Sequence, residues 1–260
     1  MRRFIADFLA SSVVVCIATG ALAELPNNYV NALNILIEPD ARPTVSNVAS
    51  GFGASGGQKF LAVSYTDQDL QTLEPGDDDG SIIIGTGFGD PSESLGVEIA
   101  LGITSVSSPF WGDGKFGDEG NLNLKLHKYL GSSVLGEISS VSFGASNLVG
   151  WGATQDIPTN LYLAYSEIDF VGQFSQYGVA YTIGYGTSVA SGEKEAGLFG
   201  GIGLARSNYN ASISFIDESV HYSATWYMPY LRGTSVTYTY ARNNSENIPN
   251  QNILSLGYSF

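Results

Sequence analysis

The chain has 260 residues and a formal net charge of −14, and only 14% of its residues are charged. A negative charge of this size excludes attraction to nucleic acid or to anionic lipid headgroups through net charge. Glycine is frequent, with 32 residues, and 15 tyrosines and 13 phenylalanines accompany it. Low charge with high aromatic content is unusual for a soluble secreted protein, whose surface carries many charged side chains.

The first 23 residues have the layout of a secretory signal peptide. Two arginines precede an apolar run over 8–18, and alanines at 21 and 23 form a small-residue cleavage site. The run is well short of the roughly 20 apolar residues that a membrane-spanning helix needs. We therefore expect export and cleavage after Ala23. The single cysteine, Cys16, lies in this segment, so the exported chain has no thiol for a disulfide, a metal site or a nucleophile.

From residue 59 onward, apolar side chains recur at every second position in about a dozen segments of roughly ten residues, with turn signals between them. This period of two is the signature of β-strands with one apolar face. In chain order the predicted strands are 59–66, 80–88, 95–103, 121–129, 134–145, 160–168, 177–186, 197–206, 209–215, 220–228, 236–240 and 252–260. The alternation changes parity within 134–145, which indicates either a β-bulge or a segment that is not a strand.

The character of the second strand face separates two architectures. In a soluble barrel or sandwich that face meets water and carries charge, whereas in a membrane barrel it lines the interior while the apolar face meets lipid. Here the second face is mostly Gly, Ala, Ser, Thr and Asn, and the charges lie between strands, as at 77–79, 118–119 and 193–195. The pattern therefore favours a transmembrane barrel.

The last strand carries a resemblance to a known family. Counting back in twos from Phe260 gives Tyr258, Leu256 and Leu254, with small or polar residues between them. A chain that ends on an aromatic residue, with a second aromatic two positions earlier, resembles the closing strand of bacterial outer-membrane β-barrel proteins. The glycine usual in that family is offset here to Gly257. The resemblance implies that Tyr258 and Phe260 form the signal read by the outer-membrane assembly machinery.

With the alternating segments, this resemblance implies an all-β, antiparallel up-and-down transmembrane β-barrel of about 12 strands, within a range of about 10–14. The predicted connections fall into two sets, and such barrels have long external loops and short periplasmic turns. We expect outside the cell the mostly longer, acidic set at 67–79, 107–119, 150–159, 188–195, 216–219 and 243–250. We expect in the periplasm, with both chain ends, the mostly short set at 89–93, 131–133, 169–176, 207–208 and 229–232.

The predicted organisation has three parts: a signal peptide over 1–23, an N-terminal segment over 24–58, and the barrel over 59–260. The segment 24–58 contains an apolar stretch at 29–37, followed by two prolines and a glycine-rich stretch. Two interpretations stay open for it. It is either a periplasmic leader or a plug that enters the lumen.

No motif in the sequence predicts a cofactor. Residues 51–56 match the G-x-G-x-x-G motif of dinucleotide-binding proteins, but a strand follows instead of the helix whose N-terminus binds pyrophosphate. The acidic residues at 77–79 and at Asp113, Asp118 and Glu119 lack the spacing of an EF-hand. We interpret them as solvated loop charges, with Ca²⁺ or Mg²⁺ shared with lipopolysaccharide phosphates as the alternative.

The predicted inward face carries few larger polar side chains, and the candidates for lining the lumen are Glu98, Lys125, His127, Tyr129, His221 and Ser223. His221 and Ser223 share one strand face, and some outer-membrane lipid hydrolases pair a histidine and a serine in this way. Those pairs face lipid, whereas the alternation here directs both side chains inward, and no third group that orients the imidazole is evident. We therefore expect no enzymatic activity, and keep a lipid hydrolase as the least favoured alternative.

These features predict a porin-like channel in the outer membrane of a Gram-negative bacterium. A lumen lined by Gly, Ala and Ser leaves space for passive diffusion of small hydrophilic solutes, and acidic outer loops favour cations at the mouth. The expected partners are outer-membrane lipid and lipopolysaccharide, the assembly machinery and the solutes, with no nucleic acid. The alternative is a sealed structural or adhesive barrel whose outer loops contact a host, a phage or a matrix.

Overall fold

Twelve antiparallel strands form one closed barrel in the computed structural model, which describes residues 43–68, 79–104, 116–131, 138–171, 177–189, 195–243 and 250–260. The strands are β1 (Lys59–Gln68), β2 (Asp79–Phe88), β3 (Gly96–Ile103), β4 (Gly120–Gly131), β5 (Ile138–Trp151), β6 (Asn160–Val171), β7 (Tyr177–Gly186), β8 (Gly197–Arg206), β9 (Tyr209–Ile216), β10 (Ser219–Tyr227), β11 (Thr234–Asn243) and β12 (Gln251–Ser259). A short 3-10 helix, η1 (Gly152–Asp156), follows β5. The described residues include no helix long and apolar enough to cross a bilayer.

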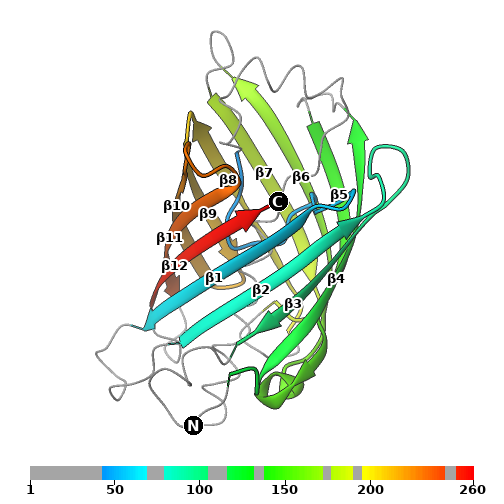
Figure 1. The fold of residues 1–260 in the computed structure, drawn as a ribbon, viewed down its shortest axis with the longest axis vertical. Helices are drawn as coiled ribbons and strands as arrows, with labels where there is room; N and C mark the ends of the chain where they lie inside the picture. The colour runs from blue at the N-terminus through cyan, green and yellow to red at the C-terminus, as the bar shows by residue number, and fades with distance from the viewer. Residues whose placement is uncertain are drawn as a thin grey trace.

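Each strand pairs with the next one along the chain, and β1 pairs with β12 to close the ring (Figure 1). At this closing seam Phe60 lies opposite Ser259, and Gln68 lies opposite Gln251. Closure pairs both edges of every strand, which a membrane requires because lipid tails offer no hydrogen-bond partners. The predicted all-β, antiparallel up-and-down barrel and its strand number are confirmed.

The predicted strands match the observed ones except at β5, which the sequence pattern placed at 134–145; of this range, 134–137 lie outside the described residues. In the structure β5 runs from Ile138 to Trp151. Its register with β4 shifts within this range, since Leu124 lies opposite Ala145 whereas Leu122 lies opposite Val149. The extra residues of β5 form a bulge in which Asn147 has a φ of 52°, in the left-handed region that asparagine tolerates. A bulge changes which face successive residues meet, so the alternation that marked the other strands ends at Ala145.

The outward face of the barrel is apolar, and the inward face is small and polar. Alternate residues of β9 and β12 are exposed and buried in turn, as the period of two requires. The exposed outward side chains include Leu61, Val63, Ile84, Ile99, Leu101, Phe143, Leu161, Leu163, Ile183, Leu198, Ile202, Leu204, Ile213, Leu254 and Leu256. A continuous apolar belt of this extent is unfavourable in water and favourable in hydrocarbon.

Residues 43–58, here called the luminal strap, lie inside the barrel before the chain enters β1 (blue in Figure 1). The strap joins the wall at Gly56 and Gly57, whose main-chain nitrogens donate to the carbonyl oxygens of Gly89 and Gly87 at 2.9 and 2.8 Å. Both strap glycines have positive φ values, 57° and 91°, which a glycine adopts without strain. The remainder of the predicted 24–58 segment and the predicted signal peptide, 1–23, lie outside the described residues.

The short connections 89–95, 207–208 and 228–233 lie at the same end of the barrel as Lys59 and Phe260, and this end is here called the short-loop end. The main chains of Lys59 and Phe260 exchange hydrogen bonds there, at 2.8 and 2.9 Å. The expectation that this end faces the periplasm stays a prediction. Asp77, Asp78, Asp113 and the 193–194 pair of the acidic connections lie outside the described residues.

Candidate functional site

The interior of the barrel is the candidate site, and strands β9 to β11 bind the first part of the luminal strap. The Thr44 nitrogen donates to Asn210 Oδ1 at 3.2 Å, and Asn210 Nδ2 donates to the Thr44 carbonyl oxygen at 3.1 Å. The Ser46 nitrogen donates to Ser212 Oγ at 3.2 Å, and Ser214 Oγ donates to the Ser46 carbonyl oxygen at 2.7 Å. Residues two apart on a strand share a face, so β9 presents these three side chains to one stretch of strap.

Asn47 fixes a turn of the strap to two further strands. Its Nδ2 donates to Ser223 Oγ of β10 at 2.8 Å and to Thr239 Oγ1 of β11 at 3.1 Å. The two hydroxyl oxygens are also hydrogen-bonded to each other at 2.8 Å, because Ser223 and Thr239 lie directly opposite in the β10–β11 pair. Asn47 has a φ of 66°, a conformation in which asparagine is enriched.

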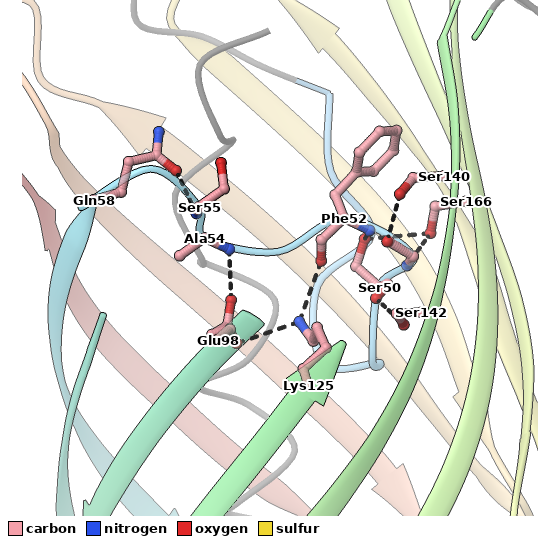
Figure 2. Close-up of polar contacts among 11 residues, drawn as sticks. Ser50, Phe52, Ala54, Ser55, Gln58, Glu98, Lys125, Ser140, Ser142 and Ser166 are labelled. Carbon is pink, nitrogen blue, oxygen red and sulfur yellow. Dashed lines mark hydrogen bonds and ion pairs between the residues drawn. The ribbon is translucent and has the colours of Figure 1, made fainter. Parts of the chain in front are cut away.

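Three serines of β5 and β6 bind the middle of the strap (Figure 2). Ser142 Oγ donates to the Ser50 carbonyl oxygen at 2.8 Å, and Ser140 Oγ donates to the Gly51 carbonyl oxygen at 2.7 Å. The Gly51 nitrogen donates to Ser166 Oγ at 2.8 Å. The Ser50 and Ser166 hydroxyl oxygens lie 3.2 Å apart. The wall thus reaches both polar groups of the Gly51 main chain.

An ion pair on β3 and β4 binds the last part of the strap. Lys125 Nζ lies 3.4 Å from Glu98 Oε1, and both side chains are at most 4% exposed. The second carboxylate oxygen of Glu98 accepts from the Ala54 nitrogen at 2.7 Å, and Lys125 Nζ donates to the Phe52 carbonyl oxygen at 3.2 Å (Figure 2). A buried ion pair is tolerated when such further hydrogen bonds satisfy its charged groups.

His127 lies against the strap beside this ion pair. A Cβ atom on Gly53 would lie 2.8 Å from His127 Nδ1, so a side chain at this position would displace either the imidazole or the strap. The two ring nitrogens of His127 are buried and have no hydrogen-bond partner within the described ranges. Close packing against the strap therefore holds this side chain in place.

The strap also has an apolar side. Val48 and Phe52 are buried in a cluster that includes the inward-facing Tyr129, Tyr162 and Phe199. The Phe52 ring lies 5.9 Å from the Tyr129 ring, and the Tyr162 and Phe199 rings meet edge to face at 6.3 Å, a favourable arrangement for aromatic pairs. The strap is thus held by apolar contact in addition to hydrogen bonds.

The structure places the predicted lumen-lining residues on the inward face, where all of them are buried: Glu98, Lys125, His127, Tyr129, His221 and Ser223. It brings Glu98 and Lys125 into contact, and the His127 and Tyr129 rings lie 6.2 Å apart. His221 and Ser223 lie on β10, and within the described part of the chain no hydrogen bond joins them. Among all the residues that the structure describes, no group of three or more His, Cys, Asp or Glu side chains could hold a metal ion.

Sequence reasoning missed the serines and the asparagine that bind the strap: Ser140, Ser142, Ser166, Asn210, Ser212 and Ser214. Their spacing of two along β5 and β9 placed them on one face, but nothing local distinguishes a serine that binds a strap from one that lines water. The G-x-G-x-x-G match at 51–56 belongs to the strap. Its first and second glycines, Gly51 and Gly53, lie where the wall leaves no room for a side chain.

The aromatic residues of the predicted assembly signal lie on the outer surface at the closing seam. The Tyr258 and Phe260 rings are stacked with centroids 5.2 Å apart, and both side chains are exposed. Lys59 Nζ of β1 lies 6.0 Å from the centre of the Phe260 ring, within the range of a cation–π contact. A function in assembly stays a prediction.

No protein-family model and no curated protein matches the chain. Among solved structures it is similar to an outer membrane channel from Pseudomonas putida F1, with 12% identity, a TM-score of 0.48, and coverage of 78% of this chain and 96% of that chain. It is also similar to the outer membrane protein Omp33 from Acinetobacter baumannii, with 9% identity, a TM-score of 0.44, and coverage of 78% and 98%. For the attachment invasion locus protein of Yersinia pestis the values are 9% identity, a TM-score of 0.21, and coverage of 78% and 99%. At these identities the likeness is one of barrel architecture.

Proposed function

We propose that the protein is an outer-membrane channel for small hydrophilic solutes and that the luminal strap holds it closed. The observation that carries this proposal is that one segment, tethered to the wall at Lys59, crosses an interior whose wall is made largely of small polar side chains. Serine hydroxyls such as those of Ser140, Ser142 and Ser212 bind the strap, and water can replace it at each of them. Release of the strap therefore opens a polar path without any change in the barrel.

The apolar belt supports a location in a membrane, and a barrel of this kind reaches the outer membrane after export through a signal peptide. Lipopolysaccharide and outer-membrane lipid are then its surroundings, and the assembly machinery is the partner that reads Tyr258 and Phe260. Passage through the channel involves no chemical step. Ser223 supports the absence of a chemical step. Its hydroxyl is hydrogen-bonded to Asn47 and Thr239, and among the described residues it has no hydrogen bond with His221, the base that a hydrolase would need.

A joint of two glycines connects the strap to the barrel. Gly56 and Gly57 are exposed, and a Cβ atom on Gly57 would meet nothing within 4 Å. Glycines tolerate a wide range of backbone angles, so the strap can rotate away once the hydrogen bonds from Gly56 and Gly57 to Gly89 and Gly87 break, while β1 keeps its pairing with β2 and β12. The strap is thus able to leave the interior from its N-terminal side.

A sealed surface barrel is the second candidate, and the apolar side of the strap favours it. Burial of a Val or Phe side chain contributes about 1.5–3 kcal/mol, so the release of Val48 and Phe52 carries a considerable cost. If that cost keeps the strap in place permanently, the barrel serves as a rigid support for its outer loops.

A reversible lock on the strap separates the two candidates. The Ser50 and Ser166 hydroxyl oxygens lie 3.2 Å apart, and the predicted exported chain contains no cysteine. The double variant Ser50→Cys/Ser166→Cys can therefore form one disulfide between strap and wall. Its conductance is measured in planar bilayers under oxidising conditions and after addition of dithiothreitol, with each single variant as the matched control.

The proposed channel predicts that the oxidised double variant is closed and that reduction restores openings, while both single variants open under either condition. A variant that lacks 24–55 is expected to stay open throughout. If the reduced double variant and the variant without the strap are both silent, although both migrate as folded barrels on unboiled gels, the channel is wrong and the sealed barrel stands.

A further inference from the structure

We infer that the barrel interior is a binding site for a peptide main chain, and that the luminal strap is its intramolecular occupant. The inference rests on the proposed channel and names its solute class: short peptides in which an apolar residue lies between two glycines. With the strap displaced, the same wall groups bind such a peptide when it enters from solution.

The main evidence is that the wall binds the strap largely through main-chain atoms. Side chains of the wall form nine hydrogen bonds with strap nitrogens and carbonyl oxygens, at Thr44, Ser46, Ser50, Gly51, Phe52 and Ala54. Main-chain recognition does not depend on the side chains of the bound segment. A wall that only had to anchor its own strap could use strap side chains, as it does at Asn47 and Ser50.

The wall groups also match the alternation of donors and acceptors in a peptide. The groups that accept from strap nitrogens are the Ser166 and Ser212 hydroxyls, Asn210 Oδ1 and the Glu98 carboxylate. The groups that donate to strap carbonyl oxygens are the Ser140, Ser142 and Ser214 hydroxyls, Asn210 Nδ2 and Lys125 Nζ. A sugar or a simple ion does not present this sequence of N–H and C=O groups, whereas a peptide main chain does.

The Glu98–Lys125 ion pair determines the chain direction in which a peptide binds. Glu98 accepts from the Ala54 nitrogen and Lys125 donates to the Phe52 carbonyl oxygen, on either side of Gly53 (Figure 2). Hydrogen bonds with a charged partner are roughly twice as strong as neutral ones. Because Glu98 requires an N–H and Lys125 requires a C=O, the pair accepts a peptide in one chain direction.

Packing sets which peptides fit. A Cβ atom on Gly53 would lie 2.8 Å from His127 Nδ1, and one on Gly51 would lie 2.7 Å from the Ser166 nitrogen. Position 51 therefore requires glycine, because main-chain atoms surround it, and position 53 favours glycine, because a side chain there would displace His127 or Lys125. The residue between them places its side chain beside Tyr129, as Phe52 does with a ring separation of 5.9 Å. The site thus selects a glycine, an apolar residue and a second glycine in succession.

The test of the peptide site cuts the strap from the barrel by proteolysis, after the full-length protein has folded. A protease recognition sequence is inserted between Gly56 and Gly57, in the exposed joint, and the purified full-length protein is cleaved in detergent. A fluorescent synthetic peptide with the sequence of residues 43–57 is then titrated against the cleaved barrel, with polarisation as the readout. Uncleaved protein, in which the tethered strap competes, is the control.

Three altered peptides test main-chain recognition. In the first, ester oxygens replace the Gly51 and Ala54 nitrogens, which removes two donors without added bulk. In the second, one ester replaces the Val45 nitrogen, which donates no hydrogen bond to the wall among the described residues. The third carries Gly53→Val. We expect at least about tenfold weaker binding for the first and third peptides, and a change within about twofold for the second.

Equal affinity for the unmodified peptide and the double ester, or no binding of the unmodified peptide to the cleaved barrel, would overturn the inference. Conductance of the same cleaved protein distinguishes this failure from failure of the channel. Openings without peptide binding reject the peptide site alone, and peptide binding without openings rejects the channel alone.

If the insertion prevents folding, the uncleaved chain with Ser46→Cys provides the same test. Ser46 is buried against Ser212 and Ser214, so a maleimide reaches the new thiol only while the strap is displaced. A peptide that occupies the wall delays the return of the strap and raises the labelling rate, by an expected threefold or more at saturation. An unchanged rate at millimolar peptide contradicts the inference.

Discussion

Glu98 and Lys125 lie directly opposite each other on β3 and β4, with Lys125 Nζ 3.4 Å from Glu98 Oε1. Each side chain also binds the main chain of the luminal strap, so one ion pair connects two neighbouring strands to the segment between them. Both charges are buried. The cost of taking them out of water is offset only while both partners and the strap remain in place.

The first prediction concerns this pair. Glu98→Gln leaves the Lys125 ammonium buried without its counter-charge, and Lys125→Met does the same to the carboxylate. Each single variant is expected to lose about 3–5 kcal/mol of unfolding free energy, because an uncompensated charge remains in the interior. The double variant keeps similar volume and removes both charges, so it is expected to recover most of this loss. Urea unfolding in detergent micelles measures all three, and additive losses would contradict the assignment.

A second prediction concerns Ser223 and the strap. Ser223→Ala removes the acceptor for Asn47 Nδ2 and one side of the bond with Thr239. The variant is expected to lose about 0.5–1.5 kcal/mol and to open more often in planar bilayers. Asn47→Ala is the matched partner, and a double-mutant cycle should show that the two changes are not additive. Release of fatty acid from phospholipid by the natural protein, abolished in Ser223→Ala, would instead establish the hydrolase alternative.

The strands were predictable because their two faces meet chemically different surroundings. Leu254 and Leu256 contact the outside while Ser255 is buried within, and a similar contrast recurs along β9 and β10. This contrast between the two faces can be recognised in the sequence because side chains alternate with a period of two along a strand. The bulge at Asn147 broke that period, so the second half of β5 escaped prediction.

The strap contacts were not predictable in this way. The hydrogen bond between Ser214 and the Ser46 carbonyl oxygen joins residues 168 positions apart. A serine on an inward face has the same local pattern whether it binds water or a strap. The pairing of Glu98 with Lys125 was likewise out of reach, since alternation assigned each to the inward face without fixing the register between β3 and β4.

A third prediction tests whether lipid surrounds the belt. Ile213 is 51% exposed near the middle of β9, next to Ser212, which is buried inside. Ile213→Arg is expected to lower the stability in lipid vesicles by about 2–4 kcal/mol, because it places a charge in hydrocarbon. Tyr230→Arg, in the 228–233 turn, is the control and should cost about 1 kcal/mol or less. If both variants refold into vesicles equally well, the belt does not contact lipid.

The last prediction concerns the close approach of Gly53 to His127. Gly53→Ala adds a methyl group whose position lies 2.8 Å from His127 Nδ1, so either the imidazole or the strap has to move. Overpacking of this kind costs typically about 1–3 kcal/mol, and the expected result is a strap that leaves the wall more readily, seen as more frequent channel openings. His127→Ala provides the space that the methyl group needs. The double variant is therefore expected to open less often than Gly53→Ala alone, because the strap returns to its position beside Lys125. If His127→Ala gives no such rescue, the imidazole does not limit the path of the strap, and the preference for glycine at position 53 comes from the Lys125 side chain, whose Cδ would lie 3.1 Å from the new methyl group.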